Sequence, residues 1–435
     1  MTRTTTLSLL AGATAGLVAS GALADAATPA GASNDEIRAM VADMLADAET
    51  RSSLLQAGGT AGHDGKFFLA SPDGAFRLNV GGQIQFRYVL NFRDDGGNVP
   101  IGNLRDDFES GFQTRRTKLT FDGTVYNDMF FKIQGIFNRA GGGFALEDAY
   151  VGYDYGNGFK AIVGQFKSPF SREQLVSSKR QLAVDRSFVD GLFNAGRVQG
   201  IMVTYSEDTW RTMLSFNDGE RTANTDFITN NQGVGGVRGG EGDWGFSGRF
   251  EYLGGGSWDQ FKDFSSARGS EGLAWMLGAA LEYQDGAADL ILDNGGSLFS
   301  YTFDASLEGD GWNAFGAFIG RHVDNEFTDA GSADQYGFVV QGGIFVTEDI
   351  EPFVRWDTLL PDTGSAFNTI TFGANWYIHG HAAKFTLDVQ WFLDAPASVG
   401  GFDKAAIGAN TGIGFLGSGI EEDEFAVRAQ FQLLF

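Results

Sequence analysis

The sequence offers few residues for covalent or metal chemistry. It contains no cysteine, which excludes disulfides, thiolate metal sites and a cysteine nucleophile. Of the four histidines, His379 and His381 stand one residue apart and could together hold a metal ion. They join two expected strands and have no obvious further ligands, so we interpret them as a plain turn. We therefore expect no metal, no cofactor, no catalytic residue and no enzymatic activity.

Basic residues are the clearest candidates for a binding function. In the first half of the chain, six of them alternate with apolar residues: Arg77, Arg87, Arg116, Lys118, Lys132 and Lys167. On the wall of a narrow pore, such cations would concentrate anions and exclude cations. Arginine suits phosphate because its planar guanidinium can donate two parallel hydrogen bonds. The alternative is that lumen charges neutralise one another, because acids lie nearby in the sequence: Asp122, Glu147, Glu173, Asp185 and Asp190.

The net charge of -24 is distributed unevenly. Residues 75–200 hold 16 Lys and Arg against 13 Asp and Glu, whereas residues 201–435 hold 11 against 34. A molecule this acidic repels polyanions, so we expect no nucleic-acid partner. The acidic second half could lie harmlessly on exterior loops, or it could reverse the field at the mouth of a pore.

The N-terminal region has the pattern of an exported protein. Residues 1–24 combine Arg3, an apolar stretch and the small residues Ala22-Leu23-Ala24, which is typical of a secretory signal peptide. Residues 25–64 are expected to form a linker and a periplasmic amphipathic helix that begins near Ser33. This helix could pack on its own barrel, join three protomers as a short coiled coil, or bind a periplasmic partner.

From residue 75 onward the hydrophobic period becomes two. Apolar and polar residues alternate strictly over 76–92, which is far longer than a typical soluble strand. A tilted membrane strand needs about 9–11 residues within lipid. We therefore predict an all-β fold for 65–435, a closed antiparallel transmembrane β-barrel of about sixteen strands. The expected strands lie near 76–92, 118–125, 131–137, 147–155, 159–167, 198–205, 209–217, 245–253, 273–284, 297–308, 311–323, 334–346, 350–359, 367–378, 382–392 and 424–435.

The ends of the expected strands also fit an outer-membrane barrel. Trp and Tyr residues cluster there, as in the aromatic belts at membrane interfaces. Short turns are expected at the periplasmic rim, and the long connections 218–244, 254–272 and 393–423 are expected to face outward. The final strand places Phe431, Leu433 and Phe435 on one face. That ending looks like the signal that the barrel assembly machinery recognises.

Several motifs, in their order along the chain, resemble the phosphate-selective porin O and P family. Gly65 to Gly74 followed by Phe76-Arg77-Leu78 is similar to the entry into the barrel of that family. Arg115 to Leu119 and the stretch 368–377 also resemble family segments. The segment Gly164 to Leu175 resembles its hallmark most closely. The resemblance runs over roughly 65–435 and is strongest at 110–205.

The resemblance implies a homotrimer of sixteen-stranded porins in the bacterial outer membrane, surrounded by lipid and conducting small inorganic ions. It also implies that residues 168–197 fold inward as a constriction loop, and the apolar residues in this segment agree with packing. The family selects anions with lumen cations, which would add four residues on or near this loop: Lys179, Arg180, Arg186 and Arg197.

The predicted function is passive diffusion of small hydrophilic solutes, with anions such as phosphate preferred. Three alternatives stay open. The chain could be a general or cation-leaning porin, a structural barrel that tethers the outer membrane through its N-terminal helix, or an outer-membrane enzyme.

Overall fold

The computed structural model describes residues 38–39, 41–43, 60–92, 108–137, 141–224, 244–269, 272–285, 297–324, 332–394 and 424–435. The chain divides into two units, Met1–Gly58 and Gly59–Phe435. In the first unit the described residues are helical and exposed, within the stretch where we predicted a helix. The predicted signal peptide lies outside the described residues. No helix in the described part of the chain is long and apolar enough to span a membrane.

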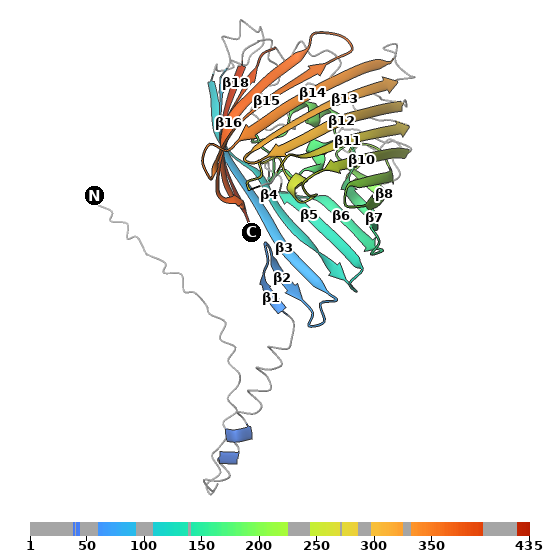
Figure 1. The fold of residues 1–435 in the computed structure, drawn as a ribbon, viewed down its shortest axis with the longest axis vertical. Coiled ribbons are helices and arrows are strands. Elements are labelled where there is room, and N and C mark those ends of the chain that lie inside the picture. The colour runs from blue at the N-terminus through green and yellow to red at the C-terminus, as the bar shows by residue number, and fades with distance from the viewer. Residues whose placement is uncertain are drawn as a thin grey trace, which may run out of the picture. The chain divides into compact units, whose positions relative to one another are not determined.

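Sixteen long antiparallel strands form a closed ring, as predicted (Figure 1). Each strand pairs with its neighbours along the chain, and the last strand pairs with β3 through Phe425–Leu434 and Gln83–Phe92. Closure leaves no unpaired sheet edge in the lipid. The strands are β3 (Arg77–Phe92), β4 (Phe108–Val125), β5 (Met129–Phe137), β6 (Phe144–Asp154), β7 (Phe159–Lys167), β8 (Arg197–Ser206), β9 (Trp210–Asn217), β10 (Trp244–Gly254), β11 (Ala274–Asp285), β12 (Ser297–Gly309), β13 (Trp312–Asp324), β14 (Ala333–Ile344), β15 (Ile350–Leu360), β16 (Phe367–His381), β17 (Ala383–Phe392) and β18 (Glu424–Leu434).

A short hairpin precedes the ring. Strand β1 (Thr60–His63) pairs with β2 (Phe67–Ala70), and β2 pairs with Arg77–Val80 at the start of β3. The edge of β3 is therefore shared between β2 at its beginning and β18 over the rest of its length. Residues 60–63 are thus strand, although they fall in the segment that we expected to be linker.

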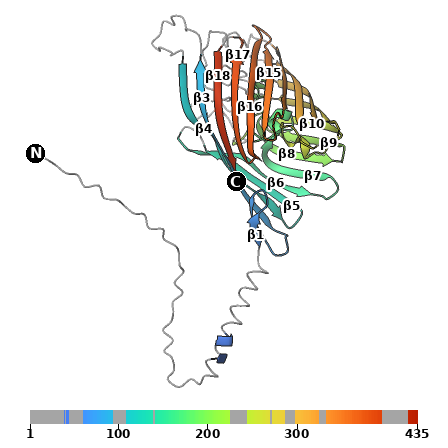
Figure 2. The ribbon, with the colours of Figure 1, turned by 60° about the vertical axis from the view of Figure 1, so that its left-hand side comes forward.

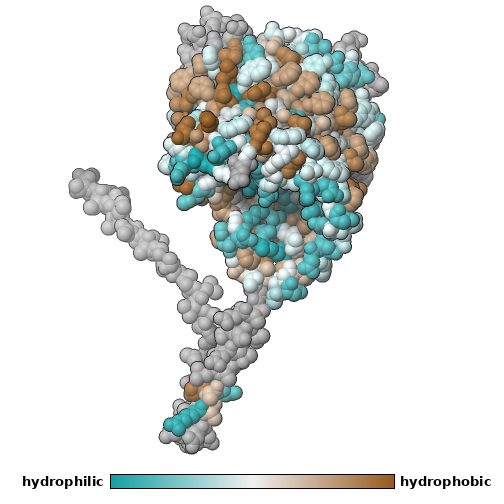
Figure 3. Space-filling view, viewed as in Figure 1, coloured by the Kyte–Doolittle hydropathy of each residue, from teal (hydrophilic) through white to brown (hydrophobic). Residues whose placement is uncertain are grey.

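The alternation of the sequence becomes the two faces of the wall. Large apolar side chains such as Phe86, Phe112, Val151 and Phe303 are exposed on the outside, and Figure 3 shows apolar side chains gathered on this wall. Trp244, Tyr252 and Trp376 are exposed on it near strand ends. Such an oily outer face and a polar interior are what a membrane barrel requires.

Aromatic rings on the wall lie over glycines of neighbouring strands. At Gly82 an added Cβ would overlap the ring of Phe435, and the backbone of the two residues is joined by two hydrogen bonds. The same arrangement recurs between strands in five further pairs: Gly135 with Phe144, Gly152 with Phe130, Gly254 with Trp275, Gly309 with Trp312, and Gly320 with Tyr301. The absence of a side chain at these glycines is therefore a packing requirement, which explains part of the high glycine content.

Two β-bulges change which side chains face the lumen. In β4, the register shifts so that Arg116 pairs with Gln85 and Thr114 with Phe86, which leaves Arg115 in the bulge. In β6, a second shift leaves Glu147 in a bulge, between Leu146 and Asp148. A bulge inserts one residue and re-aims the side chains around it. Consecutive charged residues thus both reach the interior.

Residues 168–196, which we call the inward segment, fold into the barrel as predicted (Figures 1 and 2). The segment contains two short helices, α2 (Arg172–Leu175) and α3 (Phe188–Phe193). Phe188 and Phe193 pack in one apolar cluster with wall residues of β11, β13 and β15–β18. Val176 and Leu182 pack in a second cluster with residues of β13–β15. The segment is therefore fixed against the wall formed by the second half of the chain.

The long connection 255–273 lies at a different rim from the one we predicted. Strand β10 runs toward the end of the barrel that carries the short turns 126–128, 155–158 and 207–209, so this connection belongs to that rim and not to the opposite one. It folds inward, where Phe261 and Phe264 are buried. Arg172 donates a hydrogen bond of 2.6 Å to the Phe261 carbonyl, which joins this connection to the inward segment.

Candidate functional site

The lumen contains a large cavity beside the inward segment. This cavity, which we call the vestibule, has a volume of about 1250 Å³ and is lined by residues of β3–β8, the inward segment and the short-turn rim. Twelve lysine and arginine side chains line it, against four aspartate and glutamate side chains. Its field is therefore strongly positive, although the whole chain carries a net charge of -24.

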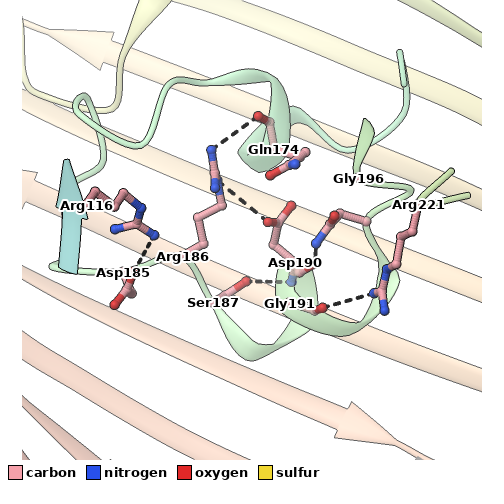
Figure 4. A pocket seen from close by; sticks show the side chains of 10 residues that line it. Arg116, Gln174, Asp185, Arg186, Ser187, Asp190, Gly191, Gly196 and Arg221 are labelled. Carbon is pink, nitrogen blue, oxygen red and sulfur yellow. Dashed lines mark hydrogen bonds and ion pairs between the residues drawn. The ribbon is translucent and has the colours of Figure 1, made fainter. Parts of the chain in front are cut away.

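A smaller pocket of about 260 Å³ lies between the inward segment and the wall (Figure 4). We call it the loop pocket. Arg116 and Arg186 line both the loop pocket and the vestibule, so these two guanidinium groups mark the passage between them. Arg221, from the connection after β9, closes the other side of the loop pocket and donates hydrogen bonds to the carbonyls of Gly191 and Leu192.

The structure brings nine of the ten cations proposed from the sequence to the vestibule. Arg87 is the exception, because it lies fully buried beneath the inward segment and pairs with Asp185 at 2.7 Å. The nine that line the vestibule are Arg77, Arg116, Lys118, Lys132, Lys167, Lys179, Arg180, Arg186 and Arg197.

Several of these cations are paired with carboxylates on the wall. Lys118 contacts Glu147 at 2.7 Å, Lys132 contacts Asp148 at 2.6 Å, and Arg197 contacts Asp148 at 2.6 Å. The bulge in β6 makes this possible, because it directs both Glu147 and Asp148 into the lumen. The expected neutralisation of lumen charges therefore occurs along the wall of β4–β8, but it involves only part of the positive charge.

Two other cations hold the inward segment in place. Lys167 donates hydrogen bonds from Nζ to the carbonyls of Gln174 and Leu175, at 2.6 and 3.2 Å. Arg186 donates to the carbonyls of Glu173 and Val176, at 2.8 and 2.9 Å. Arg186 also lies 3.7 Å from the Asp190 carboxylate, which offsets part of its positive charge.

Lys179 and Arg180 face the vestibule from the inward segment. Within the described residues, neither side chain forms an ion pair with a carboxylate. Burial, together with the charges of Lys66, Arg180 and Lys132, lowers the pKa of Lys179 to about 8. A cation crowded by other cations is a favourable place for an anion, because an anion relieves their mutual repulsion.

Asp185 attaches the inward segment to the wall. Its carboxylate contacts Arg87 and Arg116 at 2.7 Å and Arg115 at 3.4 Å. Burial opposes ionisation, but these three guanidinium groups outweigh it and hold the pKa of Asp185 well below its usual range. Sequence reasoning missed Arg115, because strict alternation assigns it to the lipid face and the bulge cannot be recognised from spacing.

The wall behind the inward segment carries acids that are paired with arginines. Arg249 contacts Asp304 at 2.8 Å and Glu251 at 2.7 Å, and both of the other pairs, Arg428 with Asp388 and Arg321 with Glu220, are within 2.7 Å. These arginines were also missed, although they alternate with outward apolar residues in their strands, which is the signal that could have identified them. These four acids of the second half are thus neutralised locally.

The helices of the inward segment cap each other. Ser171, the N-cap of α2, donates to Asp190 of α3 at 2.6 Å, and Ser187, the N-cap of α3, donates to Glu173 of α2 at 2.5 Å. Burial, and then the Asp190 carboxylate, raise the pKa of Glu173 to about 7. Burial also raises the pKa of Asp190. Burial and the repulsion between the two carboxylates favour protonation of one of them.

Two histidines, His63 and His381, line the vestibule. His381 Nε2 lies 3.2 Å from the Ser265 hydroxyl and 3.4 Å from the Asp263 carboxylate. In a nucleophilic triad the acid holds one ring nitrogen and the serine the other. Here both partners meet the same nitrogen, so this trio lacks that geometry. Among the described residues, no group of three or more potential metal ligands is present.

A closed sixteen-stranded barrel with an oily wall, a charged lumen and an inward segment is the architecture of an outer-membrane porin. Residues 86–237 match the family model of phosphate-selective porin O and P. This confirms the resemblance over the stretch that contains the most family-like motifs. The chain is therefore an outer-membrane porin that is similar to this family over residues 86–237.

Solved structures share the fold. The anion-selective porin from Comamonas acidovorans is 14% identical, with a TM-score of 0.56 over 83% of this chain and 100% of that chain. The outer-membrane channel DcaP of Acinetobacter baumannii is 13% identical, with a TM-score of 0.52 over 82% of this chain and 98% of that chain. OmpT of Vibrio cholerae, an outer-membrane protein, is 10% identical, with a TM-score of 0.51 over 83% and 98%. No curated protein matches the chain.

Proposed function

We propose that this porin conducts small hydrophilic solutes with a preference for anions, inorganic phosphate included. The observation that supports this most directly is the vestibule, where twelve basic side chains face four acidic ones. A solute that crosses the barrel meets this potential in a low-dielectric passage, where fixed charge acts strongly on mobile ions.

The acidity of the chain is compatible with this proposal. In the lumen, several acids of the second half are paired with Arg249, Arg321 and Arg428. They lie behind the inward segment, whose apolar clusters cover that part of the wall. The charge that a passing ion meets is therefore set by β3–β8 and the inward segment rather than by the average over the sequence.

The experiment compares zero-current potentials of single channels in planar bilayers under a KCl gradient. The double variant K179Q/R180Q removes two vestibule cations that have no carboxylate partner among the described residues. The control K160Q/R268Q removes the same charge from two side chains that do not line the vestibule. We expect K179Q/R180Q to shift the potential toward zero and the control to leave it unchanged. Equal potentials for both variants would contradict a selective role for the vestibule.

The finer points of organisation are proposals as well. We infer that residues 1–24 are removed on export, that residues 25–64 lie in the periplasm, and that three copies assemble. The exposed side chains of Phe431, Leu433 and Phe435 on the outer face of the last strand support recognition by the assembly machinery. Passive diffusion needs no catalytic residue, and the geometry around His381 supports a channel without enzymatic activity.

A further inference from the structure

The vestibule has an apolar side that simple ion conduction does not explain. Ile136 of β5, Tyr150 of β6, Ile162 and Phe166 of β7, and Met202 of β8 all line it, and we call these five residues the apolar strip. Inward positions of a water-filled barrel are normally polar. The exposed parts of Ile136, Tyr150 and Met202 leave an oily surface in contact with water, which is unfavourable unless something covers it.

The apolar strip has a firm base. Ile162 and Phe166 are buried and pack with Val198, while Phe130, Tyr150 and Met202 complete the cluster. The ring of Phe130 meets that of Tyr150 edge to face, with centroids 6.4 Å apart. The half-buried members, Ile136, Tyr150 and Met202, are the ones whose surface is available to a bound molecule.

Cations border the apolar strip at fixed cross-strand positions. Lys118 lies directly opposite Ile136, and Lys132 lies directly opposite Tyr150. Side chains at opposite positions of an antiparallel pair are close neighbours, with Cβ atoms about 4.5–5.5 Å apart. Lys179 and Arg180, which have no carboxylate partner among the described residues, line the same cavity. The cavity thus presents cations that suit an anionic headgroup directly beside an apolar surface.

We propose that the vestibule binds amphipathic organic anions, in which a carboxylate or phosphate is attached to an aromatic or branched aliphatic body. The headgroup contacts the cations, and the body covers the apolar strip. This inference rests on the proposed anion preference, and it goes beyond that preference because chloride or inorganic phosphate gains nothing from an oily surface. Benzoate and acetate carry the same charge and differ in the ring, so they isolate the contribution of the apolar strip.

The test is block of the chloride current through single channels in planar bilayers. We expect benzoate to block the wild-type channel at a concentration about tenfold lower than acetate, because covering apolar surface stabilises binding by roughly fourfold per methylene equivalent. Benzylammonium, which has the same ring and the opposite charge, should not block. Equal block by benzoate and acetate, or block by benzylammonium, would overturn the inference.

A variant tests whether the apolar strip causes the preference for benzoate over acetate. In M202Q/I136T, two of its members become polar at similar volume, and we expect the preference for benzoate over acetate to fall to about twofold or less. The control is M213Q, because Met213 lies on β9 opposite Arg249 and does not line the vestibule. A benzoate preference that survives in M202Q/I136T as it does in M213Q would contradict a role for the apolar strip.

The zero-current potential of the same channels under a KCl gradient separates the two proposals. An anion-selective potential without a benzoate preference would contradict only the binding of amphipathic organic anions. A potential that is zero or cation-selective would contradict the proposed anion preference, on which the binding of amphipathic anions rests. If M202Q/I136T fails to assemble, the wild-type comparison of benzoate, acetate and benzylammonium still decides the matter.

Discussion

Single residues determine how much of the lumen charge remains available to a solute. Lys118 and Lys132 are cations that alternation in the sequence predicts, yet they are paired with wall carboxylates. Lys179 and Arg180 are not paired among the described residues, and only the family resemblance placed them near the lumen. Alternation predicts which face a side chain occupies, but it does not predict its partner, because partners come from other strands and from the inward segment.

Asp185 is the residue whose loss should disturb the site most. In D185N, the guanidinium groups of Arg87, Arg115 and Arg116 lose their shared carboxylate while they remain buried. Removing one member of a buried ion pair costs about 3–5 kcal/mol, so we expect the free energy of unfolding to fall by that amount. Urea unfolding in lipid vesicles measures it.

The matched control for D185N is D334N. Asp334 is exposed and, among the described residues, pairs with His322 at 2.8 Å, so its replacement should leave the unfolding midpoint nearly unchanged. The same preparations should show a stronger anion preference in D185N than in the wild type, because a lumen carboxylate has been removed. A D185N protein as stable as D334N would show that the inward segment is held by its apolar clusters alone.

The anion preference should rise as the pH falls. The pKa of Lys179 is lowered to about 8, so this side chain gains its charge as the pH drops through that value. The pKa of Glu173 is raised to about 7, so its carboxylate is neutralised as the pH drops further. Both steps make the lumen more positive, and zero-current potentials between pH 9 and pH 5 should show them.

Two variants test which residue causes each of these pH-dependent steps. K179Q should remove the upper step, and E173Q should remove the lower one while the other remains. Glu173 faces Asp190, Ser187, Arg186 and Arg355, so the lower step belongs to this whole group and not to one isolated carboxyl. A potential that is constant between pH 9 and pH 5 would show that neither group influences the permeating ion.

At the scale of elements, the period of two in the sequence predicts all sixteen strands, because lipid and lumen impose opposite polarity on alternate residues. The rim of connection 255–273 was predicted wrongly from its length. Strand order would have been the better guide, since the connection after an even-numbered barrel strand must return to the rim at which the first strand begins. The bulges at Arg115 and Glu147 leave no such signal, because they depend on how one strand meets its neighbour.

The bulge in β4 predicts how the strand responds to deletions. Removing Arg115 joins Thr114 to Arg116, whose partners Phe86 and Gln85 are already consecutive, so the ladder becomes regular. We expect this protein to assemble, as judged by heat-modifiable migration on gels, and to lose part of its anion preference. Removing Thr117 from the regular ladder would instead shift part of β4 by one residue and exchange its lipid and lumen faces.

The deletion of Thr117 is therefore expected to prevent assembly. Both variants lose a single residue from the same strand, which makes them a matched pair. Assembly of both, or failure of both, would contradict the assignment of Arg115 to the bulge.

At the scale of the whole molecule, local charge and total charge point in opposite directions. The chain carries a net charge of -24, yet the vestibule has an excess of basic side chains. Composition could not predict this, because it does not distinguish lumen from surface. Folding neutralises acids against arginines on one half of the wall and leaves basic side chains in surplus along the other.

Ionic strength should reveal which charge acts on the solute. The screening length is about 10 Å at 0.1 M salt and about 3 Å at 1 M, so the vestibule field reaches the pore axis only at low salt. We expect the anion preference to weaken markedly between these concentrations in the wild type. A preference that is independent of salt would point to selection by size rather than by fixed charge.

The anion selectivity of the vestibule is tested most simply by the zero-current potential of the wild-type porin in a planar bilayer, with KCl more concentrated on one side. We expect a potential of the sign that chloride diffusion produces, and we expect this potential to decrease when phosphate is added and occupies the vestibule. A potential of zero, or of the sign that potassium diffusion produces, would contradict the claim that the vestibule makes this porin selective for anions.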